Sequence, residues 1–504
     1  MSRSSCKGVL PMKSYPDLPA YTGFNTPSRM EVDIDDLEVE GQVPTELDGI
    51  FFRVGPDPQY PPLLGSDIYF NGDGMISAFR FENGRVDLKC RYARTDKFLL
   101  ERAAKHALFG AYRNPFFDDP QVAGKIRGTA NTNVLVHGGK LLALKEDSPP
   151  LAMDPWTLET QGYWDFDGKL ASETFTAHPK IDPRNGEMIC FGYSAKGIAT
   201  PDLAYYVVDA QGRIVHETWI EMPYPCMVHD FGVTQDYVVF PIVPVVSSLE
   251  RAKEGKPTFG WDSSKDVWLG VLPRRGTARD LRWFRAPNRF ASHVMNAFND
   301  GSKIYVDMPV AKGNMFPFFP DITGAPFDPV AAVANLNRWS VDYNKLGGEI
   351  GFEQLTTLAG EFPRIDDRYA SEPYRHGYLS VSDRSRPFDV QRAGSITGMF
   401  INCLGHIDHA TKRQDVFYAG PVSSMQEPAF VPKSATSPEG EGYLVVLINR
   451  HDELRSDLLV LDAQNLEAGP LATIKLPLKL RNGLHGNWAS IDQLPPRPVA
   501  VASA

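Results

Sequence analysis

Short apolar runs separated by turn residues make up most of the chain. Examples are Leu203–Val208, Tyr237–Val243, Trp268–Leu272 and Tyr443–Ile448, each with Gly, Pro or Asp nearby. Apolar or alternating runs of about four to eight residues, bounded by such turn residues, are typical of β-strands. The pattern therefore predicts an all-β protein built from many short strands.

One two-strand unit recurs along the chain: an apolar strand, an aspartate, a polar turn and a second strand. The aspartates of its copies are Asp154, Asp209, Asp342 and Asp462. A repeated hairpin of this kind is typical of a β-propeller, in which each blade carries the same outer turn. The spacing of the copies is irregular, so a β-sandwich with insertions stays the alternative at this point.

Two segments depart from the strand pattern. TDKFLLERAAKHALFG predicts a helix that begins at a Thr95 or Asp96 N-cap and ends at Gly110. FDPVAAVANLNRW, which begins at Phe327, is a second candidate helix. We expect both to extend from blade loops, where binding and catalytic groups are often found.

Length and composition are ordinary for a globular protein. A chain of 504 residues is long for one core unless its architecture is a repeat, and 42% hydrophobic and 23% charged residues are usual values. The formal net charge of −10 offers no basic footprint for nucleic acid or for an anionic membrane surface. We therefore expect neither nucleic-acid binding nor stable membrane association.

The cysteines and the terminal segments suggest a cytoplasmic protein. Five cysteines without paired spacing favour reduced thiols, and neither a signal-peptide core nor a stretch of about 18 apolar residues is present. We expect an N-terminal extension over residues 1–25, one propeller domain over 26–493, and a Pro-rich flexible tail over 494–504.

Four of the eleven histidines share an unusual context: His178, His229, His293 and His485. The last two and His229 each follow a proline by six to eight residues, and three of the four lie shortly after a copy of the hairpin. The steps between them are 51, 64 and 192 residues, and the last step is three times 64. If each histidine lies where the chain enters the next inner strand, the four converge on the propeller axis. Four unrelated histidines, each bonded in its own turn, are the alternative.

Convergence would have a definite chemistry. Four imidazoles suit a borderline metal, and octahedral iron(II) would keep two positions open, whereas zinc with four histidines would be closed and structural. Each metal-bound imidazole normally donates its second N–H to an acceptor, so carboxylates are expected around the four rings.

The contexts of these histidines match a known family. AHPK, MVHDF, ASHVMNAF and LHGNW surround them, and FNGDGM (Phe70–Met75), EFPRID and QEPAFVPK occur elsewhere. With these motifs the chain resembles the carotenoid cleavage oxygenases, and within them the bacterial lignostilbene α,β-dioxygenases, over nearly its whole length. The resemblance implies a seven-bladed propeller with a dome of helices and loops over an axial iron. It also implies one Fe²⁺ per chain, with Glu146, Glu361 and Glu427 around the histidine ligands.

The same resemblance assigns the substrate residues. Tyr112 and Lys145 match positions that contact a phenol oxygen in stilbene-cleaving relatives, and Phe70 matches one against the phenol ring. An ordinary surface pair is the alternative for Tyr112 and Lys145. Thr132 matches a threonine that restricts an open iron position, although a simple turn hydroxyl is nearly as good an account. The loop NMFPFFPDI (Met315, Phe316, Phe318, Phe319) is apolar enough to wall an aromatic pocket or to touch a membrane, and a phenolic substrate favours the pocket.

These positions imply cleavage of the central double bond of a 4-hydroxystilbene by dioxygen to give two aromatic aldehydes. The partners are then a small phenolic substrate and O₂, with homodimerisation left open. The nearest alternative is an isoeugenol-type alkene-cleaving oxygenase, which needs the same phenol-activating pair. A retinoid isomerohydrolase-like enzyme and a propeller used only for binding are the alternatives from other classes.

Overall fold

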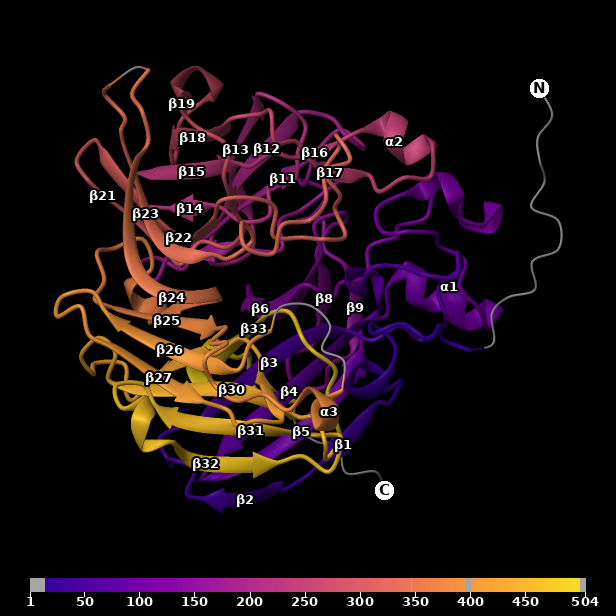
Figure 1. Cartoon of the computed structure of the whole chain (residues 1–504), viewed down its shortest axis with the longest axis vertical. Helices are drawn as coiled ribbons and strands as arrows, with labels where there is room; N and C mark the ends of the chain where they lie inside the picture. The colour runs from indigo at the N-terminus through magenta and orange to yellow at the C-terminus, as the bar shows by residue number, and fades with distance from the viewer. Residues whose placement is uncertain (1–13, 346, 395–399, 499–504) are drawn as a thin grey trace.

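A computed structural model describes residues 14–345, 347–394 and 400–498, which form a ring of antiparallel sheets (Figure 1). Within this part of the chain seven sheets act as blades around a common axis. Blades 4 and 5 share strand β24 (Gly351–Ile365), whose first half pairs with β23 and whose second half pairs with β25. The fold is therefore the expected seven-bladed propeller, and the β-sandwich alternative was wrong.

The first three blades follow one another along the chain, each as a simple antiparallel meander. Blade 1 contains β6 (Asn133–His137), β7 (Lys140–Leu144), β8 (Leu151–Met153) and β9 (Thr160–Tyr163). Blade 2 contains β10 (Lys180–Ile181), β11 (Met188–Tyr193), β12 (Asp202–Val208) and β13 (Ile214–Glu221). Blade 3 contains β14 (Gly232–Val233), β15 (Tyr237–Ile242), β18 (Val267–Pro273) and β19 (Arg282–Ala286).

The next two blades make up the sheet that bends at β24. Blade 4 contains β20 (Phe290–Ala291), β21 (Asn296–Asp300), β22 (Lys303–Ala311) and β23 (Asn335–Asp342), followed by the first half of β24. Blade 5 contains the second half of β24, β25 (His376–Val381), β26 (Cys403–Asp408) and β27 (Gln414–Tyr418).

Segments from both ends of the sequence close the ring. Blade 6 contains β28 (Ser423–Met425), β29 (Ala429–Pro432), β30 (Gly442–Arg450), β31 (Arg455–Asp462), β32 (Pro470–Lys475) and, at its edge, β2 (Glu38–Gly41). Blade 7 contains β33 (Gly486–Ser490), β3 (Gly49–Pro56), β4 (Gly74–Glu82), β5 (Arg85–Tyr92) and β1 (Val32–Ile34). In Figure 1 indigo β2 lies beside yellow β32, so early and late strands hydrogen-bond within the same sheets.

The core lies between neighbouring blades. Leu142 and Leu144 of blade 1, for example, pack in one buried cluster with Tyr206 and Val208 of blade 2. A strand covered on both faces needs apolar side chains on both, which explains why so many strands read as continuous apolar runs. The runs named from the sequence correspond to β12, β15, β18 and β30.

The repeated hairpin forms the outer turn of its blade in all four copies, as expected. Each of the four aspartates ends the third strand of its blade or directly follows it, and the chain then enters the fourth strand; the four are Asp154, Asp209, Asp342 and Asp462. In every copy the carboxylate accepts a hydrogen bond from the backbone N–H two residues later, at 2.9 to 3.1 Å. This local bond fixes the turn, which explains why aspartate recurs there.

The first predicted helix starts where the sequence indicated and ends earlier. In α1 (Asp96–Ala104) the Thr95 side chain accepts a hydrogen bond from the N–H of Phe98, and Lys105 ends the helix with a φ of 61°. The N–H groups of Leu108 and Phe109 bond to the carboxylate of Glu101 at 2.9 and 3.1 Å instead of continuing the helix. The predicted end at Gly110 was therefore wrong.

The helix predicted from Phe327 is absent. One turn around Asp328 is followed by β23, which pairs with β22 over eight residues. Val330 is 80% exposed, so the apolar residues of this segment have no surface on which a helix could pack. Pairing with β22 buries Leu336 and Trp339 completely, and this tertiary gain outweighs the local helical pattern.

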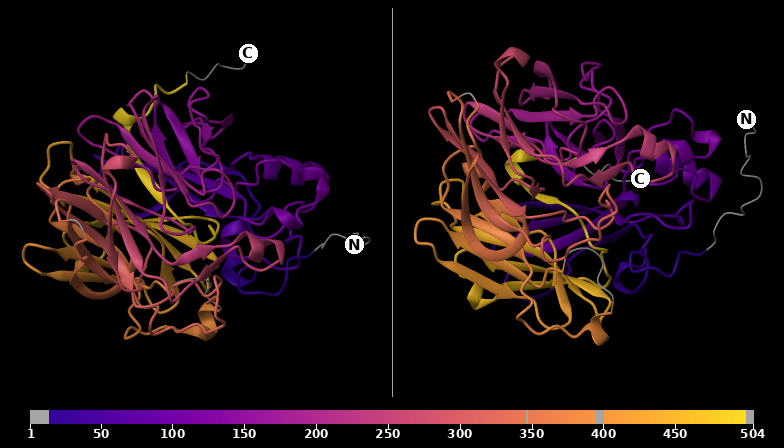
Figure 2. Two further views of the ribbon diagram at one scale, coloured as in Figure 1. Left: turned by 90° about the horizontal axis from the view of Figure 1, so that it is seen from above. Right: turned by 45° about the horizontal axis from the view of Figure 1, so that its top comes forward.

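The remaining elements are small excursions from the ring. Beside blade 3 lie β16 (Val245–Ser247), β17 (Phe259–Trp261) and α2 (Leu249–Lys253), and α3 (Val390–Ala393) follows blade 5's β25 (Figure 2). Among the described residues no helix is long and apolar enough to cross a membrane. Cys90, Cys190, Cys226 and Cys403 are unpaired and buried.

The expected division into extension, domain and tail stays a prediction. Residues 1–13 of the extension and 499–504 of the tail lie outside the described residues. In the described parts, Tyr21 and Phe24 are buried, and the carbonyl of Pro495 accepts a hydrogen bond from Trp156 at 2.8 Å.

Candidate metal centre

The four histidines lie where the chain enters the axis of the propeller. His178 precedes β10, His229 precedes β14, His485 precedes β33, and His293 lies between β20 and β21. Each therefore stands at the innermost edge of its blade, and the 192-residue step from His293 to His485 spans three blades. Whole blades therefore separate the four histidines, as their spacing in the sequence suggested.

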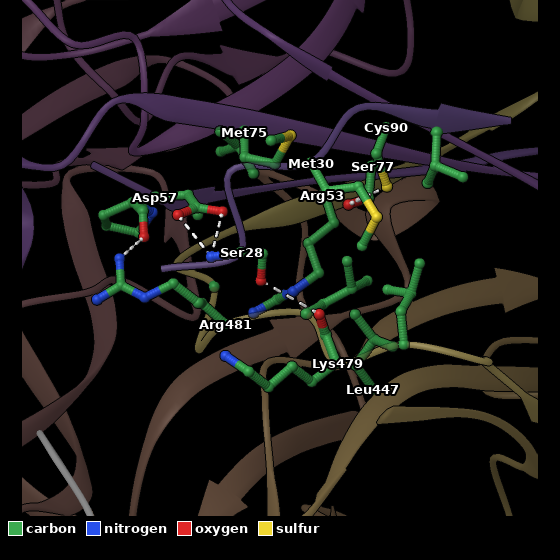
Figure 3. A pocket seen from close by; sticks show the side chains of 17 residues that line it. Ser28, Met30, Arg53, Asp57, Met75, Ser77, Cys90, Leu447, Lys479 and Arg481 are labelled. Carbon is green, nitrogen blue, oxygen red and sulfur yellow. Dashed lines mark hydrogen bonds between the residues drawn. The ribbon is translucent and has the colours of Figure 1, made fainter. Parts of the chain in front are cut away.

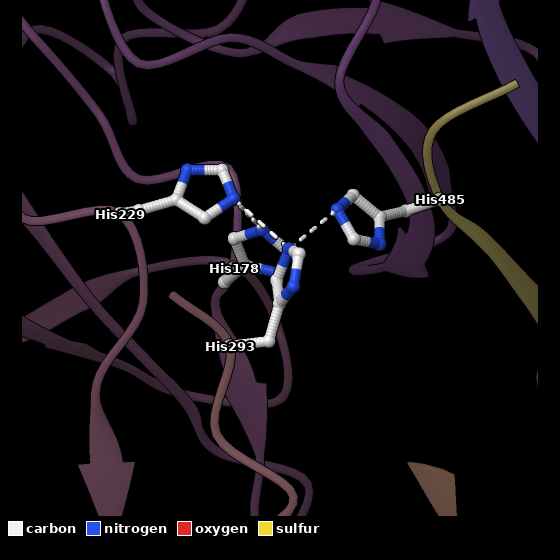
Figure 4. A group of neighbouring side chains, drawn as sticks. All are labelled: His178, His229, His293 and His485. Carbon is white, nitrogen blue, oxygen red and sulfur yellow. Dashed lines mark hydrogen bonds between the residues drawn. The ribbon is translucent and has the colours of Figure 1, made fainter. Parts of the chain in front are cut away.

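The four imidazole rings converge on one point (Figure 4). The Nε2 atoms of His178 and His229 are 3.2 Å apart, those of His229 and His293 are 3.0 Å apart, and those of His293 and His485 are 3.1 Å apart. All four ligand atoms lie within 4.8 Å of one another. A metal with bonds of about 2.1 Å separates adjacent octahedral ligands by about 3.0 Å and opposite ones by about 4.2 Å, so the set can hold one metal ion.

Three glutamates hold three of these rings from the other side. Nδ1 of His229 bonds to Glu146, Nδ1 of His293 bonds to Glu361 at 2.5 Å, and Nδ1 of His485 bonds to Glu427 at 2.9 Å. Because an ionised carboxylate only accepts, each Nδ1 carries the proton and each Nε2 is left with a lone pair for a metal. The glutamates come from blades 1, 5 and 6, which supply no ligand histidine.

The ionisation states agree with this arrangement for His178 and His485, whereas burial of His293 is outweighed by Glu361, which raises the pKa of His293. Burial raises the pKa of Glu146, but His229 and Arg113 outweigh it and bring the pKa to about 2; His485 and Arg364 do the same for Glu427. Burial and the neighbouring rings hold the pKa of His178 well below its usual value, and burial lowers that of His485 to about 4. These two rings therefore stay neutral near pH 7, and the carboxylates stay charged.

A network behind Glu146 was missed in the sequence. The Tyr193 hydroxyl donates to Glu146 at 2.8 Å, and Arg113 donates to both Tyr193 and Glu146. Arg113 comes directly after Tyr112, which the sequence predicted to bind the phenol. Nothing in the local sequence, however, distinguishes a buried arginine from an exposed one.

Asp230 and Phe362 were also missed. Asp230, next to His229, accepts a hydrogen bond from the N–H of Val294 at 2.7 Å and pairs with Lys180 at 2.7 Å, so it ties together three ligand-bearing segments. Phe362 stacks on His293 at 5.2 Å and has a φ of 52°, a conformation that is strained for a bulky side chain. The D of the MVHDF motif was the available signal for Asp230.

A cavity of about 610 Å³ with a mixed polar and apolar lining lies against one side of the centre. His178, His293 and His485 line it together with the charged residues Lys180, Asp230 and Arg364. His229 instead lines a small apolar hollow with Phe290 and Phe316. The centre thus lies between this cavity and an aromatic region.

Lys145, Tyr112 and Phe70 meet in that aromatic region, as predicted. The Lys145 Nζ lies 4.5 Å from the centroid of the Tyr112 ring and donates to the carbonyl of Phe70 at 3.3 Å, and the rings of Phe70 and Tyr112 are 6.5 Å apart. Lys145 is 3% and Tyr112 8% exposed, so the surface-pair alternative was wrong. Lys145 and Glu146 follow the end of β7 and contact different partners.

Lys145 is a buried cation without a carboxylate partner in the described part of the chain. Burial lowers its pKa, and the charges of Asp147 and Glu146 only partly oppose this. Burial also raises the pKa of Tyr112 above its usual range, which keeps its hydroxyl protonated. The pair therefore offers donors to an anionic oxygen.

The loop after β22 completes the aromatic region. Phe316 and Phe318 contact Phe70 at 6.3 and 5.2 Å between ring centroids, and Phe319 contacts Tyr112 at 6.1 Å. This is the aromatic wall that the sequence suggested. The hydroxyl of Thr132 bonds to the Asn131 side chain at 3.1 Å, and its carbonyl accepts from the N–H of His485 at 3.2 Å. The oxygen-site role of Thr132 stays a prediction.

This geometry defines a class of protein, namely a β-propeller with a four-histidine centre on its axis. The model of the retinal pigment epithelial membrane protein family matches residues 25–490. The chain therefore belongs to this family, the carotenoid oxygenase family to which its motifs pointed.

Three relatives are similar over nearly the whole length. The chain is 53% identical to lignostilbene-alpha,beta-dioxygenase isozyme III of Sphingomonas paucimobilis, covering 96% of this chain and 99% of that one. It is 46% identical to isoeugenol monooxygenase of Pseudomonas putida, covering 94% and 98%. The crystal structure of Pseudomonas brassicacearum lignostilbene dioxygenase superposes with a TM-score of 0.92 at 46% identity, covering 95% and 99%.

Proposed function

We propose that this protein is a non-haem iron(II) dioxygenase that cleaves the central double bond of 4-hydroxystilbenes derived from lignin. The observation that carries the proposal is the buried Lys145 ammonium beside Tyr112 and Phe70, in a chain whose histidines can hold a metal. The two products are aromatic aldehydes, and each receives one atom of dioxygen.

The metal would be one Fe²⁺ per chain, held by His178, His229, His293 and His485. Four neutral imidazoles leave the double positive charge uncompensated, and the three ionised glutamates offset it through the rings. When bound, a ferrous ion would supply the redox chemistry that activates dioxygen.

Lys145 and Tyr112 would activate the organic substrate. The phenol oxygen of a 4-hydroxystilbene accepts hydrogen bonds from the Lys145 ammonium and the Tyr112 hydroxyl, while Phe70 packs against the ring. A cation and a donor at this oxygen favour phenolate over phenol, since both stabilise the charged form. The charge of a phenolate is delocalised into the central alkene, which becomes electron-rich and ready for oxidation. A hydrocarbon without a phenol would gain nothing from this pair.

A substrate panel tests the proposal. The iron-loaded protein is incubated with 4-hydroxystilbene, with stilbene that lacks the hydroxyl, and with isoeugenol, and aldehyde release is measured. We expect turnover of the first compound and at least about 100-fold less of the second. Equal turnover of both stilbenes would contradict the proposal that the substrate is activated through its phenol oxygen.

Isoeugenol is the second candidate substrate, because the Pseudomonas putida relative at 46% identity is named for it. A higher kcat/KM for isoeugenol than for the stilbene would favour that activity. With labelled O₂, label in the aldehydes supports oxygenation, whereas unlabelled products would favour an isomerohydrolase-like reaction.

A histidine pair tests the metal. His293→Ala should lose iron and activity together, because one ligand and the bond to Glu361 disappear. The control His216→Gln alters a half-buried histidine of β13, the outer strand of blade 2, that contacts the carbonyl of Gly276, and should keep about one iron per chain. A fully metallated, active His293→Ala protein would show that the ligand set is wrong.

We also propose a cytoplasmic location, for which the four unpaired buried cysteines are the support. Whether the chain forms a homodimer is a matter for sedimentation measurements.

A further inference from the structure

A small cavity, none of whose lining residues is a metal-ligating histidine, lies in the seam where blade 7 is closed. Strand β3 forms one wall, and residues 28–32 and 478–483 cover it from the two ends of the sequence (Figure 3). The cavity measures about 30 Å³, room for one or two water-sized occupants. Its charged lining residues are Arg53, Asp57, Lys479 and Arg481.

Arg53 is the unusual member of this lining. It is 3% exposed, and neither Nη1 nor Nη2 has a hydrogen-bond partner among the described residues. Gly483 packs directly against the guanidinium, since a Cβ there would lie 2.3 Å from Nη2. A guanidinium is charged at any physiological pH, so two charged donors face the interior without an acceptor.

The other two cations of the lining, Lys479 and Arg481, bring no counter-charge into the cavity. Lys479 donates to the carbonyls of Phe24 and Thr26, and Arg481 donates to those of Ala20, Asn25 and Pro56. These acceptors are neutral, and none of the three cations forms an ion pair with a carboxylate in the described part of the chain. The lining therefore holds three cations and one carboxylate.

The single carboxylate is already engaged elsewhere. Asp57 accepts hydrogen bonds from the N–H groups of Ser28 and Arg29, each at 3.1 Å to one of its oxygens. Burial, aided by the charge of Arg481, lowers the pKa of Lys479 to about 8, and burial lowers that of Arg53 to about 10, which the charge of Glu427 only partly opposes. Both shifts reflect a cost of keeping positive charge in this seam. A water molecule would accept from Arg53, but it would not offset the charge.

We propose that this cavity is a binding site for one small inorganic anion of the size of chloride, held by Arg53. Figure 3 shows the Arg53 side chain reaching from β3 toward Ser28, whose hydroxyl is 3.4 Å from the carbonyl of Lys479 and can turn to donate to the anion. The volume excludes a larger organic anion, and the donors are too few to saturate a tetrahedral oxyanion.

The position of the site gives it a structural consequence. Val54, next to Arg53, accepts a hydrogen bond from the N–H of Leu484 at 2.9 Å and donates to the carbonyl of His485 at 3.0 Å. An anion at Arg53 would hold together residues 28–32, strand β3 and the segment that delivers His485. Its effect should therefore be on the stability of the closed ring.

Bromide tests the site directly in the full-length, iron-loaded protein. Crystals soaked in bromide and measured above the bromine edge should show an anomalous peak within about 3.5 Å of the Arg53 Nη atoms. Water alone at that position, with no anomalous peak, would overturn the proposal.

A solution measurement uses variants. At constant ionic strength, replacing gluconate by chloride should raise the melting temperature of the wild-type protein by about 1–3 °C. Arg53→Met should abolish this difference, while the control Arg85→Met, which removes an exposed arginine, should retain it. If Arg53→Met does not fold, Lys479→Met should reduce the chloride effect instead. A wild-type protein that melts at the same temperature in both salts would contradict the proposal.

Discussion

Two buried lysines bond to the same turn and differ in their partners. Lys97 of α1 pairs with Glu101 at 2.8 Å and with Asp73 at 3.3 Å, and its pKa is raised because these carboxylates outweigh burial. Lys145 bonds to the carbonyl of Phe70, three residues before Asp73, and burial lowers its pKa. Both side chains are under a tenth exposed.

The difference separates a structural cation from a functional one. Lys97 is neutralised within the fold, so its contribution is complete without any ligand. Lys145 is left without a counter-charge, which is costly for the free protein and becomes favourable once an anionic oxygen arrives. An unpaired buried charge at a site of this kind therefore indicates what the site binds.

The largest expected effect concerns Lys145. Lys145→Met should lower kcat/KM for 4-hydroxystilbene by about 100-fold or more while iron content stays near one per chain, because phenolate loses its charged partner. The melting temperature should stay constant or rise, since an unpaired buried charge is removed. Near-normal turnover would end the case for phenolate stabilisation by this residue.

Lys97→Met sharpens the contrast. It leaves Asp73 and Glu101 buried without their cation, so the free energy of unfolding should fall by about 3–5 kcal/mol. Denaturant titration measures this loss, and kcat per folded, iron-loaded molecule should change little. A variant as stable as the wild type, or one that loses turnover as Lys145→Met does, would show that the two lysines are not different in kind.

The pH dependence should carry the signature of Lys145. Because its pKa lies below the usual 10.5, the basic form of the lysine can take the phenol proton at a lower pH than an ordinary lysine would. The kcat/KM for 4-hydroxystilbene should therefore rise with pH along a limb centred below 10.5. The same limb should vanish in Lys145→Met; its persistence would assign it to another group.

The smallest expected effect is that of Tyr112→Phe. This change removes one hydrogen-bond donor and keeps the ring against Lys145, so kcat/KM should fall by about 5- to 20-fold. Stilbene without the para-hydroxyl is the control substrate, and its slow turnover should not change. A loss as large as that of Lys145→Met would mean that the hydroxyl, and not the ammonium, is the main partner of the phenolate.

The ring and its ligands could be predicted from sequence because both rest on local signals that recur. The outer turns depend on one aspartate bonding two residues ahead, and the histidines stand at equivalent entries to inner strands. The sequence could not reject a helix beginning at Phe327, because this segment becomes a strand through its pairing with β22, which lies outside it. Arg113, Tyr193 and Phe362 act through contacts between blades and through backbone strain, which no local pattern records.

Closure of the ring by strands from opposite ends has a consequence for how the enzyme matures. His485 and β33 leave the ribosome after every other blade has been made, and β33 must then pair with β3, synthesised more than 400 residues earlier. Until that pairing occurs the coordination sphere has three of its four nitrogens. Binding of a metal by all four histidines therefore requires that β33 has paired with β3, so it coincides with the completion of the tertiary structure.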